Sequence, residues 1–256
     1  MPELPEVETI VRGLAPLLRG RRVESVEVVA GLVVRTPLDA VCGRVVADVR
    51  RHGKFIVLEC DDELLSIHLG MTGKLLMNGE RTAYTRVVFH LDEGELLYDD
   101  IRQFGRLEWR PERLAKLGPD ALEIEEPEFV AALRTRRTHV KPLLLNQEFL
   151  RGLGNIYVDE ALFRAGVHPR AMAARLSRTR ARGLHAAIRQ VLREAIEHRG
   201  SSISDYVDAA GERGGFQKLH RVYGREGEPC VVCGKPLRRI VVAQRGTHFC
   251  PLCQKV

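Results

Sequence analysis

The stretch CVVCGKPLRRIVVAQRGTHFCPLC, residues 230–253, holds four cysteines in the pattern C-x2-C-x16-C-x2-C. Each C-x2-C pair can place two thiolates on one side of a tight turn, and the sixteen residues between the pairs suffice for a β-hairpin. A short hairpin buries little apolar surface, so a metal would hold it folded. Two disulfides or four unrelated thiols fit less well, because two further cysteines stand apart and no secretory signal is recognisable. The spacing predicts one structural zinc ion, with no open position for water, bound by Cys230, Cys233, Cys250 and Cys253.

Composition is that of an ordinary globular protein. The chain has 256 residues, of which 45% are hydrophobic and 29% charged. No stretch is long and apolar enough to cross a membrane, and the opening MPELPEVET has Pro and acids where a signal peptide needs basic and apolar residues. We therefore expect an intracellular, reducing location.

The charge is unevenly distributed along the chain. Residues 211–256 hold nine Lys and Arg against three acids, and residues 170–200 hold eight Arg against two Glu. Residues 91–130 are the reverse, with twelve acids against five basic residues. A basic side next to a zinc ribbon indicates a nucleic-acid partner, although a solvated arginine-rich helix would also explain residues 170–200.

The first half of the chain reads as a helix followed by strands. Pro5 suits a first helical turn, and apolar residues recur at helical spacing up to Gly20. The short β-rich runs that follow predict a β-sandwich rather than a parallel sheet. Those runs are Val23–Val29, Arg44–Val49, Phe55–Cys60, Leu64–Leu69, Arg86–Leu91, Glu95–Tyr98 and Leu107–Trp109.

After about residue 110 the hydrophobic period becomes helical. Helices are expected near 127–136, 142–150, 155–165 and 178–199. Residues 201–222 lack periodicity and contain three glycines, which indicates a long mobile loop, and loops of that length are usually functional or disordered.

The N-terminus offers a reactive group. If Met1 is removed, Pro2 carries a secondary α-amine, whose pKa of about 8 leaves part of it neutral near pH 7. Attack of that amine on an aldehyde carbon gives an iminium with a fixed positive charge, which is a strong electron sink. Glu3 and Glu6 stand beside it and could move protons, although acids here are equally explained by helix capping.

Several motifs together resemble the bacterial formamidopyrimidine-DNA glycosylases of the Fpg/Nei family, which excise oxidised purines from DNA. They cover nearly the whole chain, beginning with MPELPEVET and ending with VYGREGEPCVVCGKPLRRIVVAQRGTHFCPLCQ. Between these lie GKF at 53–55, HLGMTG at 68–73, DIRQFG at 100–105, VKPLLL at 140–145 and GLGNIYVDEALF at 152–163.

The resemblance implies an α+β fold in three parts. Residues 1–125 would form a catalytic β-sandwich domain with a leading helix. Residues 126–222 would form a helical domain with a helix-two-turn-helix motif and a lesion-recognition loop, and residues 223–256 a β-hairpin zinc finger. DNA would lie across the cleft between the two larger domains.

The resemblance also implies a mechanism of base excision followed by strand cleavage. Pro2 would be the nucleophile at the sugar C1′, displacing the damaged base, and its iminium would drive elimination of the 3′ and then the 5′ phosphate. Glu3 would protonate the ring oxygen and assist proton transfer, with Glu6 in a supporting role. Three residues would fill the space left by the everted nucleotide: Phe104 as a wedge, Arg102 facing the orphaned base, and Met71 in the remaining gap.

Lys54, Lys141, Asn155 and Arg245 match family residues that grip phosphates, and Lys54 and Arg245 are counted with the catalytic set. Judged from local sequence alone, Met71 and Phe104 would be core residues, Asn155 a helix cap, and Arg245 surface charge.

Tyr84 stands where histidine is frequent in the family, so a phosphate contact there is in doubt. Gln103 stands where a second basic residue is frequent, which should slightly weaken electrostatic binding without affecting the wedge.

The opening PELPE and the loop with the candidate lesion lid, Ser204–Phe216, favour 8-oxoguanine opposite cytosine and ring-opened purines as substrates. Two alternatives stay open: a relative of endonuclease VIII acting on oxidised pyrimidines or abasic sites, and a non-catalytic zinc-ribbon module that only binds DNA. We expect a monomer that binds damaged duplex DNA. Its expected location is the bacterial cytoplasm, where it would associate with the nucleoid and not with a membrane.

Overall fold

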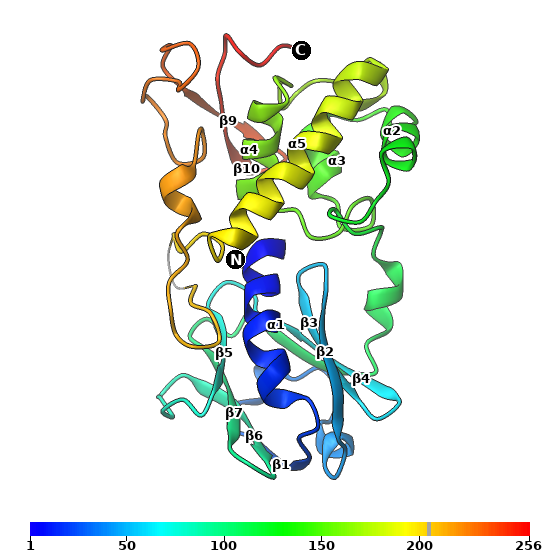
Figure 1. The fold of residues 1–256 in the computed structure, drawn as a ribbon, viewed down its shortest axis with the longest axis vertical. Helices are drawn as coiled ribbons and strands as arrows, with labels where there is room; N and C mark the ends of the chain where they lie inside the picture. The colour runs from blue at the N-terminus through cyan, green and yellow to red at the C-terminus, as the bar shows by residue number, and fades with distance from the viewer. Residues whose placement is uncertain (204–205) are drawn as a thin grey trace. The chain divides into compact units, whose positions relative to one another are not determined.

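The structure is a computed structural model that describes residues 1–203 and 206–256. The chain divides into two compact units. Unit 1 comprises Met1–Lys116 and Ile196–Gln217, and unit 2 comprises Leu117–Ala195 and Lys218–Val256. Figure 1 shows the path of the chain through both units.

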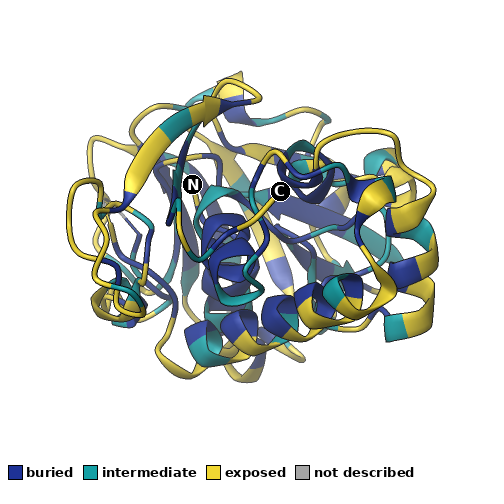
Figure 2. Cartoon of the chain, turned by 90° about the horizontal axis from the view of Figure 1, so that it is seen from above, coloured by how far each residue is buried: buried dark blue, intermediate teal, exposed yellow. Residues whose placement is uncertain are grey.

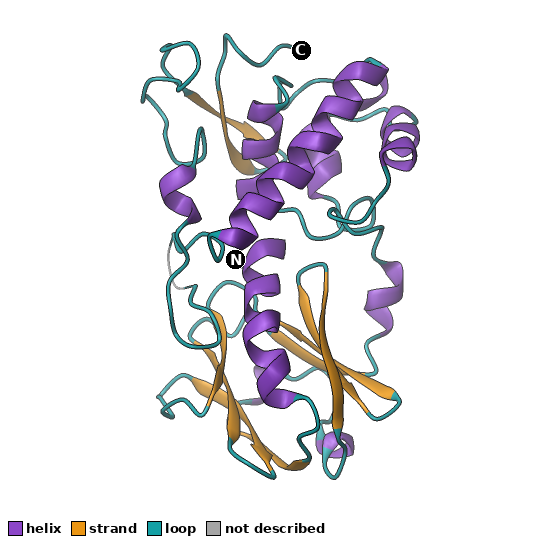
Figure 3. Ribbon diagram, in the orientation of Figure 1, coloured by secondary structure: helices purple, strands orange, loops and turns teal. Residues whose placement is uncertain are grey.

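Unit 1 is a β-sandwich preceded by helix α1 (Leu4–Leu18), as Figure 3 shows in purple and orange. One antiparallel sheet has the strand order β1-β6-β7-β5 and the other the order β2-β3-β4-β8. The strands are β1 (Val23–Val28), β2 (Val46–His52), β3 (Phe55–Cys60), β4 (Glu63–His68), β5 (Gly73–Met77), β6 (Thr85–Leu91), β7 (Glu95–Asp100) and β8 (Arg106–Trp109). Antiparallel pairing throughout these sheets confirms the predicted sandwich.

A single apolar core joins the two sheets of unit 1. It takes residues from both sheets and from the inner face of α1, where Val7, Ile10 and Leu14 recur at helical spacing. Tyr206 belongs to the same core although it lies nearly a hundred residues after the last strand of the sandwich. The segment after α5 is therefore part of unit 1.

Unit 2 contains the remaining helices and a hairpin. The helices are α2 (Glu126–Arg134), α3 (Val140–Leu145), α4 (Asn155–Arg164) and α5 (Arg178–Glu197), whose last two residues group with unit 1. The hairpin pairs β9 (Arg238–Val242) with β10 (Arg245–Phe249). Buried and exposed residues alternate along α2 and α5, as expected for amphipathic segments that cover a core, whereas α3 and α4 have no exposed residue. Figure 2 shows the burial of the described residues. Short 3-10 turns lie at Gly31–Val33, Asp39–Val41, Glu112–Lys116, Ala173–Arg175 and Phe216–Leu219.

Two features differ from the sequence predictions. Strand β5 was not predicted, because GKLLM lacks the alternation of apolar and polar residues that marks a half-buried strand. The compact units also do not follow the expected boundaries at 125 and 222. The first boundary falls after Lys116, Ile196–Gln217 packs with the sandwich, and the zinc-finger segment packs within unit 2.

Candidate active site and nucleic-acid interface

The N-terminal residues of unit 1 are held by Glu6. Pro2 and Glu3 are buried and immediately precede α1, and the Glu3 N–H donates to Glu6 Oε2 at 2.8 Å. The other carboxylate oxygen, Glu6 Oε1, accepts the Ser201 N–H at 2.7 Å. Gly200 has φ +78°, and a Cβ there would lie 2.6 Å from Glu6 Oε1. Glu6 therefore ties the start of α1 to the loop that follows α5, which fits the supporting role expected of it.

Lys54 lies in the tight turn between β2 and β3, after Gly53 at φ +61°, and is largely buried. His68, at the end of β4, packs its ring against Phe55 with centroids 4.9 Å apart. Burial, and after it the positive charges of Lys54, Arg106, Arg113 and the N-terminus, lower the pKa of His68 to about 4. A neutral His68 accepts the Gly70 N–H at Nδ1, at 3.2 Å. His68 was not singled out in the sequence, although it opens the HLGMTG motif.

Met71, Arg102 and Phe104, which we call the wedge cluster, come together in unit 1. Met71 is 42% exposed and Phe104 52% exposed, so neither is a core residue. The Arg102 guanidinium lies over the Phe104 ring, 4.6 Å from its centroid, and Arg102 Nη1 lies 3.2 Å from Met71 Sδ. Exposed apolar side chains stacked on an arginine suit insertion between bases.

Asp100 holds together the two loops that carry the wedge cluster. Its buried carboxylate accepts the Thr72 hydroxyl at 2.5 Å, the Gly105 N–H at 2.8 Å and the Tyr98 hydroxyl at 3.2 Å. The Arg102 N–H in turn donates to Thr72 Oγ1 at 3.0 Å. One carboxylate thus joins the loop that carries Met71 to the loop that carries Arg102 and Phe104. Sequence reasoning missed Asp100, although it opens the DIRQFG motif.

The two departures from the family pattern have clear positions. Tyr84 is exposed, and the Arg86 guanidinium lies 6.0 Å from the centroid of its ring. Gln103 has φ +52°, and its buried carboxamide oxygen has no hydrogen-bond partner among the described residues. Nothing in the structure gives either residue a phosphate-binding role.

The candidate lesion lid begins outside the described residues, at 204 and 205. In the described part of the loop, Tyr206 and Phe216 are buried. Ser202 is also buried, and its hydroxyl donates to the Tyr206 carbonyl at 2.8 Å and accepts the Gly214 N–H at 2.9 Å. Asp208 accepts the Ala210 and Glu212 N–H groups at 2.9 and 3.0 Å. The backbone N–H groups of residues 208, 210–212 and 214–216 all donate within unit 1.

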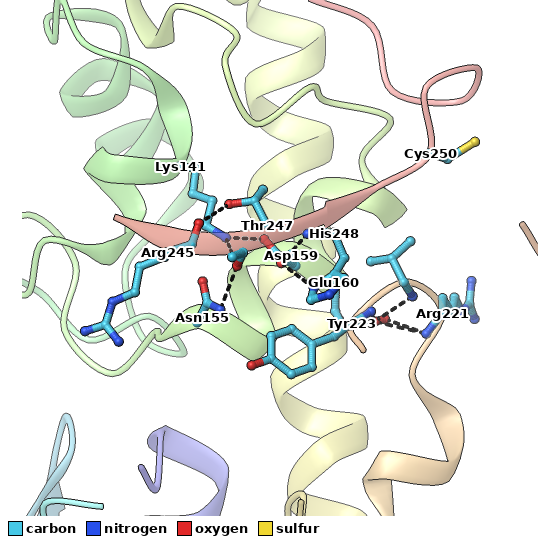
Figure 4. Close-up of polar contacts among 12 residues, drawn as sticks. Lys141, Asn155, Asp159, Glu160, Arg221, Tyr223, Arg245, Thr247, His248 and Cys250 are labelled. Carbon is cyan, nitrogen blue, oxygen red and sulfur yellow. Dashed lines mark hydrogen bonds and ion pairs between the residues drawn. The ribbon is translucent and has the colours of Figure 1, made fainter. Parts of the chain in front are cut away.

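In unit 2 the predicted phosphate-binding residues gather where α4 meets the hairpin (Figure 4). Asn155 is the first residue of α4, and its Nδ2 donates to the Gly246 carbonyl at 3.0 Å. Arg245 is exposed and follows a two-residue turn, Ala243–Gln244, in which both residues have positive φ, as in a type I′ hairpin. Lys141 differs from the prediction, because its side chain has no exposed surface and its Nζ lies 2.6 Å from Asp159 Oδ1. Direct contact of Lys141 with a phosphate does not fit this geometry.

The four cysteines of the predicted zinc site converge. Their sulfur atoms all lie within 4.8 Å of one another, with Cys233 and Cys250 at 3.5 Å and Cys230 and Cys253 at 3.9 Å. Tetrahedral coordination at about 2.3 Å requires sulfur separations of about 3.8 Å. The cluster is compatible with one structural zinc ion, and the other two cysteines, Cys42 and Cys60, lie in unit 1.

Comparisons with known proteins agree with this geometry. The model of the formamidopyrimidine-DNA glycosylase N-terminal domain matches residues 1–107, that of its H2TH domain residues 117–207, and that of the zinc finger found in FPG and IleRS residues 227–256. The chain belongs to the formamidopyrimidine-DNA glycosylase family. It is therefore a DNA glycosylase, and excision of oxidised purines and AP lyase activity belong to that family.

Individual relatives match over the full length. The formamidopyrimidine-DNA glycosylase of Solibacter usitatus is 53% identical, with both chains fully covered, and that of Brevibacillus brevis is 44% identical over 100% of this chain and 99% of the relative. The crystal structure of MutM (Fpg) from Thermus thermophilus is 43% identical with a TM-score of 0.90, covering 99% of this chain and 98% of that one. Lactococcus lactis Fpg bound to DNA with an abasic site is 35% identical with a TM-score of 0.91, covering 99% and 100%.

No helix among residues 1–203 and 206–256 is long and apolar enough to span a membrane.

Proposed function

We propose that the chain excises 8-oxoguanine and formamidopyrimidines from duplex DNA and then cleaves the strand, using Pro2 as nucleophile. The observation that carries this proposal is the wedge cluster, which is exposed and braced by a buried carboxylate. A protein that only bound DNA would need neither an inserting aromatic side chain nor the Pro2–Glu3 pair. A Lactococcus lactis Fpg variant at 36% identity was solved with DNA containing Fapy-dG, which supports the substrate class.

The chemistry begins when removal of Met1 frees the Pro2 nitrogen. That nitrogen attacks C1′, a C–N bond forms, the glycosidic bond breaks, and the base leaves after taking up a proton. Glu3 protonates the ring oxygen, so the sugar opens and an iminium remains at C1′. The iminium acidifies the neighbouring C–H bond, and successive β- and δ-elimination release the 3′ and 5′ phosphates. Water then hydrolyses the iminium and restores the amine.

Phosphate contacts are assigned to residues in both units. In unit 1, Lys54 supplies a positive charge from the turn between β2 and β3. In unit 2, Arg245 presents an exposed guanidinium, and Asn155 lies at the N-terminus of α4, where backbone N–H groups favour an anion. These contacts bind without reading sequence, as required of an enzyme that must search long DNA for rare lesions.

The wedge cluster and the lid have separate tasks in this proposal. Phe104 separates base pairs, Arg102 donates to the base opposite the lesion, and Met71 fills the vacated space. Residues 204–216 cover the everted purine. The N–H groups of residues 208, 210–212 and 214–216 donate within unit 1, so recognition of the lesion by these N–H groups requires the loop to exchange hydrogen-bond partners.

The family acts on DNA in bacteria, and we place this enzyme, as a monomer, in the bacterial cytoplasm, associated with the nucleoid through DNA binding.

Borohydride trapping tests the proposed function. Protein whose mass shows loss of Met1 is mixed with a duplex containing 8-oxoguanine opposite cytosine, and a covalent adduct is expected. Protein that retains Met1, or that carries an N-terminal tag, is the matched control and should give no adduct. Absence of an adduct from the correctly processed protein would reject the nucleophile. Faster turnover of a thymine glycol duplex than of the 8-oxoguanine duplex, at the same salt concentration, would reject the lesion assignment.

A further inference from the structure

Two consecutive acids on α4, Asp159 and Glu160, are buried without taking part in the proposed chemistry. They belong to the GLGNIYVDEALF motif, in which the sequence suggested a role only for Asn155. A buried carboxylate is costly unless hydrogen bonds or an opposite charge compensate it. Asp159 is compensated by Lys141 and by strand β10, and Glu160 by the backbone of residues 221–223, where the chain enters the zinc finger.

Asp159 holds strand β10. Its Oδ1 accepts Lys141 Nζ at 2.6 Å, and its Oδ2 accepts the His248 N–H at 2.8 Å. The Gly246 carbonyl, next to Arg245, receives Asn155 Nδ2 at 3.0 Å and Lys141 Nζ at 3.4 Å. Figure 4 shows Lys141 and Asp159 between α3, α4 and the hairpin strand that carries Arg245.

Glu160 holds the other end of the segment, where the chain enters the zinc finger. Its carboxylate accepts the N–H groups of Arg221, Val222 and Tyr223 at distances of 2.9 to 3.0 Å. The zinc site joins the cysteine turns to one another, and Phe163 of α4 packs against this end of the segment in one apolar cluster with Cys230, Leu237 and Cys250. Zinc and that cluster therefore stabilise the cysteine end, whereas Asp159 and Lys141 hold the strand that carries Arg245.

We propose that Lys141, Asp159 and Glu160 are positioning residues, which attach the zinc hairpin to α4 so that Arg245 and Asn155 present a phosphate-binding pair of constant geometry. This inference rests on the proposed function in taking Arg245 and Asn155 as DNA contacts. An arginine on a detached hairpin loses conformational entropy each time it binds, and attachment removes that cost. Buried ion pairs contribute little net stability, but they select one arrangement over its alternatives.

Single substitutions would leave one buried charge unpaired, so both charges should be removed together. In Lys141→Met/Asp159→Leu the core stays apolar, but the bonds to the His248 N–H and the Gly246 carbonyl are lost. In Lys141→Met/Asp159→Asn the new carboxamide oxygen still accepts the His248 N–H. The matched control is Arg164→Met/Glu194→Leu, which removes an ion pair of 2.6 Å that joins α4 to α5.

Two measurements test whether the hairpin is attached to α4 and whether that attachment matters for DNA binding. Hydrogen exchange of residues 245–249 in the zinc-loaded protein without DNA should be faster in Lys141→Met/Asp159→Leu and close to wild type in the control. Affinity for abasic-site DNA should fall about tenfold, and the salt dependence should lose about one phosphate contact, as in Arg245→Ala. Combining the double substitution with Arg245→Ala should weaken binding no further, because both act through the same contact. Lys141→Met/Asp159→Asn should recover part of the affinity.

The borohydride adduct formed at saturating DNA should be unchanged in yield, since Pro2 lies in unit 1. Absence of the borohydride adduct in the wild type would therefore reject the proposed function. Hydrogen exchange of residues 245–249 would still show whether Lys141 and Asp159 attach the hairpin to α4. Wild-type exchange in residues 245–249 of the Leu variant, or an effect fully additive with Arg245→Ala, would overturn the inference. If the Leu variant fails to bind zinc, the Asn variant decides. Exchange in residues 245–249 between the wild-type and fully exposed rates is expected there, because the bonds from Lys141 to Asp159 and to the Gly246 carbonyl are still lost, and exchange as slow as in the wild type would overturn the inference.

Discussion

The wedge cluster of unit 1 and the zinc hairpin of unit 2 each present an exposed arginine from a short irregular segment, and they support it differently. Arg102 is stacked on Phe104, and its loop is held by hydrogen bonds to Asp100 and Thr72. Arg245 follows a strained two-residue turn and is held by a metal site on one side and by buried carboxylates on the other. A loop anchored in a sandwich can rely on backbone hydrogen bonds. A hairpin with almost no core of its own requires a metal and ion pairs.

Removal of zinc should have the largest effect on this difference between the wedge cluster and the zinc hairpin. Chelation, or Cys233→Ser, should abolish DNA binding, because the hairpin that carries Arg245 unfolds without the metal. Unit 1 should stay folded, and Trp109 reports on it, since it is the only tryptophan and lies in the sandwich core. The measurement is urea unfolding followed by tryptophan fluorescence, alongside DNA affinity. Normal DNA affinity in zinc-free protein would contradict the structural assignment of the metal.

The next largest effect is expected at Asp100. Asp100→Ala should destabilise unit 1 by about 3–4 kcal/mol, because three donors lose their shared buried acceptor. Phe104→Ala is the matched comparison, since its side chain is half exposed and its loss should change stability by less than about 0.5 kcal/mol. Both variants should excise 8-oxoguanine at least about tenfold more slowly, because each removes or loosens the wedge. Urea unfolding and single-turnover excision measure the two effects. Unchanged excision in Phe104→Ala would remove the wedge from the proposal.

The smallest expected effect concerns pH. The pKa of His68 is about 4 in the folded protein and about 6.5 unfolded. Between these values the unfolded chain binds more protons, so the stability of unit 1 should fall as pH drops from 6.5 toward 4, by roughly 2–3 kcal/mol. Protonation also removes the acceptor for the Gly70 N–H, next to Met71, so acid should loosen the wedge cluster.

Tryptophan-detected urea unfolding at pH 7, 5.5 and 4.5 measures this pH dependence. His68→Asn is the control, because its Oδ1 can accept the same N–H without titrating in this range. An equal pH dependence in the control and the wild type would assign the effect to other groups.

Much of the architecture followed from local pattern. The predicted strand Phe55–Cys60 coincides with β3, and the predicted helix 155–165 overlaps α4 to within one residue. Strand β5 was not predicted because its sequence lacks alternation. The loop at 201–222 was predicted to be mobile because Tyr206, which anchors it, contacts Glu6 and the sandwich core, far away in sequence. Met71 and Phe104 were assigned to the wedge only through resemblance, since an apolar residue beside a strand gives no local sign of exposure.

Local sequence was enough for the zinc site, the leading helix and the alternation of the sandwich, because each is marked by a regular spacing of residues within one short segment. Tertiary structure alone decided that Lys141 pairs with Asp159 inside unit 2 and that Glu6 accepts the Ser201 N–H. It also decided that Asp100 joins two loops and that Glu160 holds the entry to the zinc finger. In each case a buried charge finds partners on a distant segment, and burial, which sequence spacing does not report, determines whether that charge faces a ligand or the protein itself.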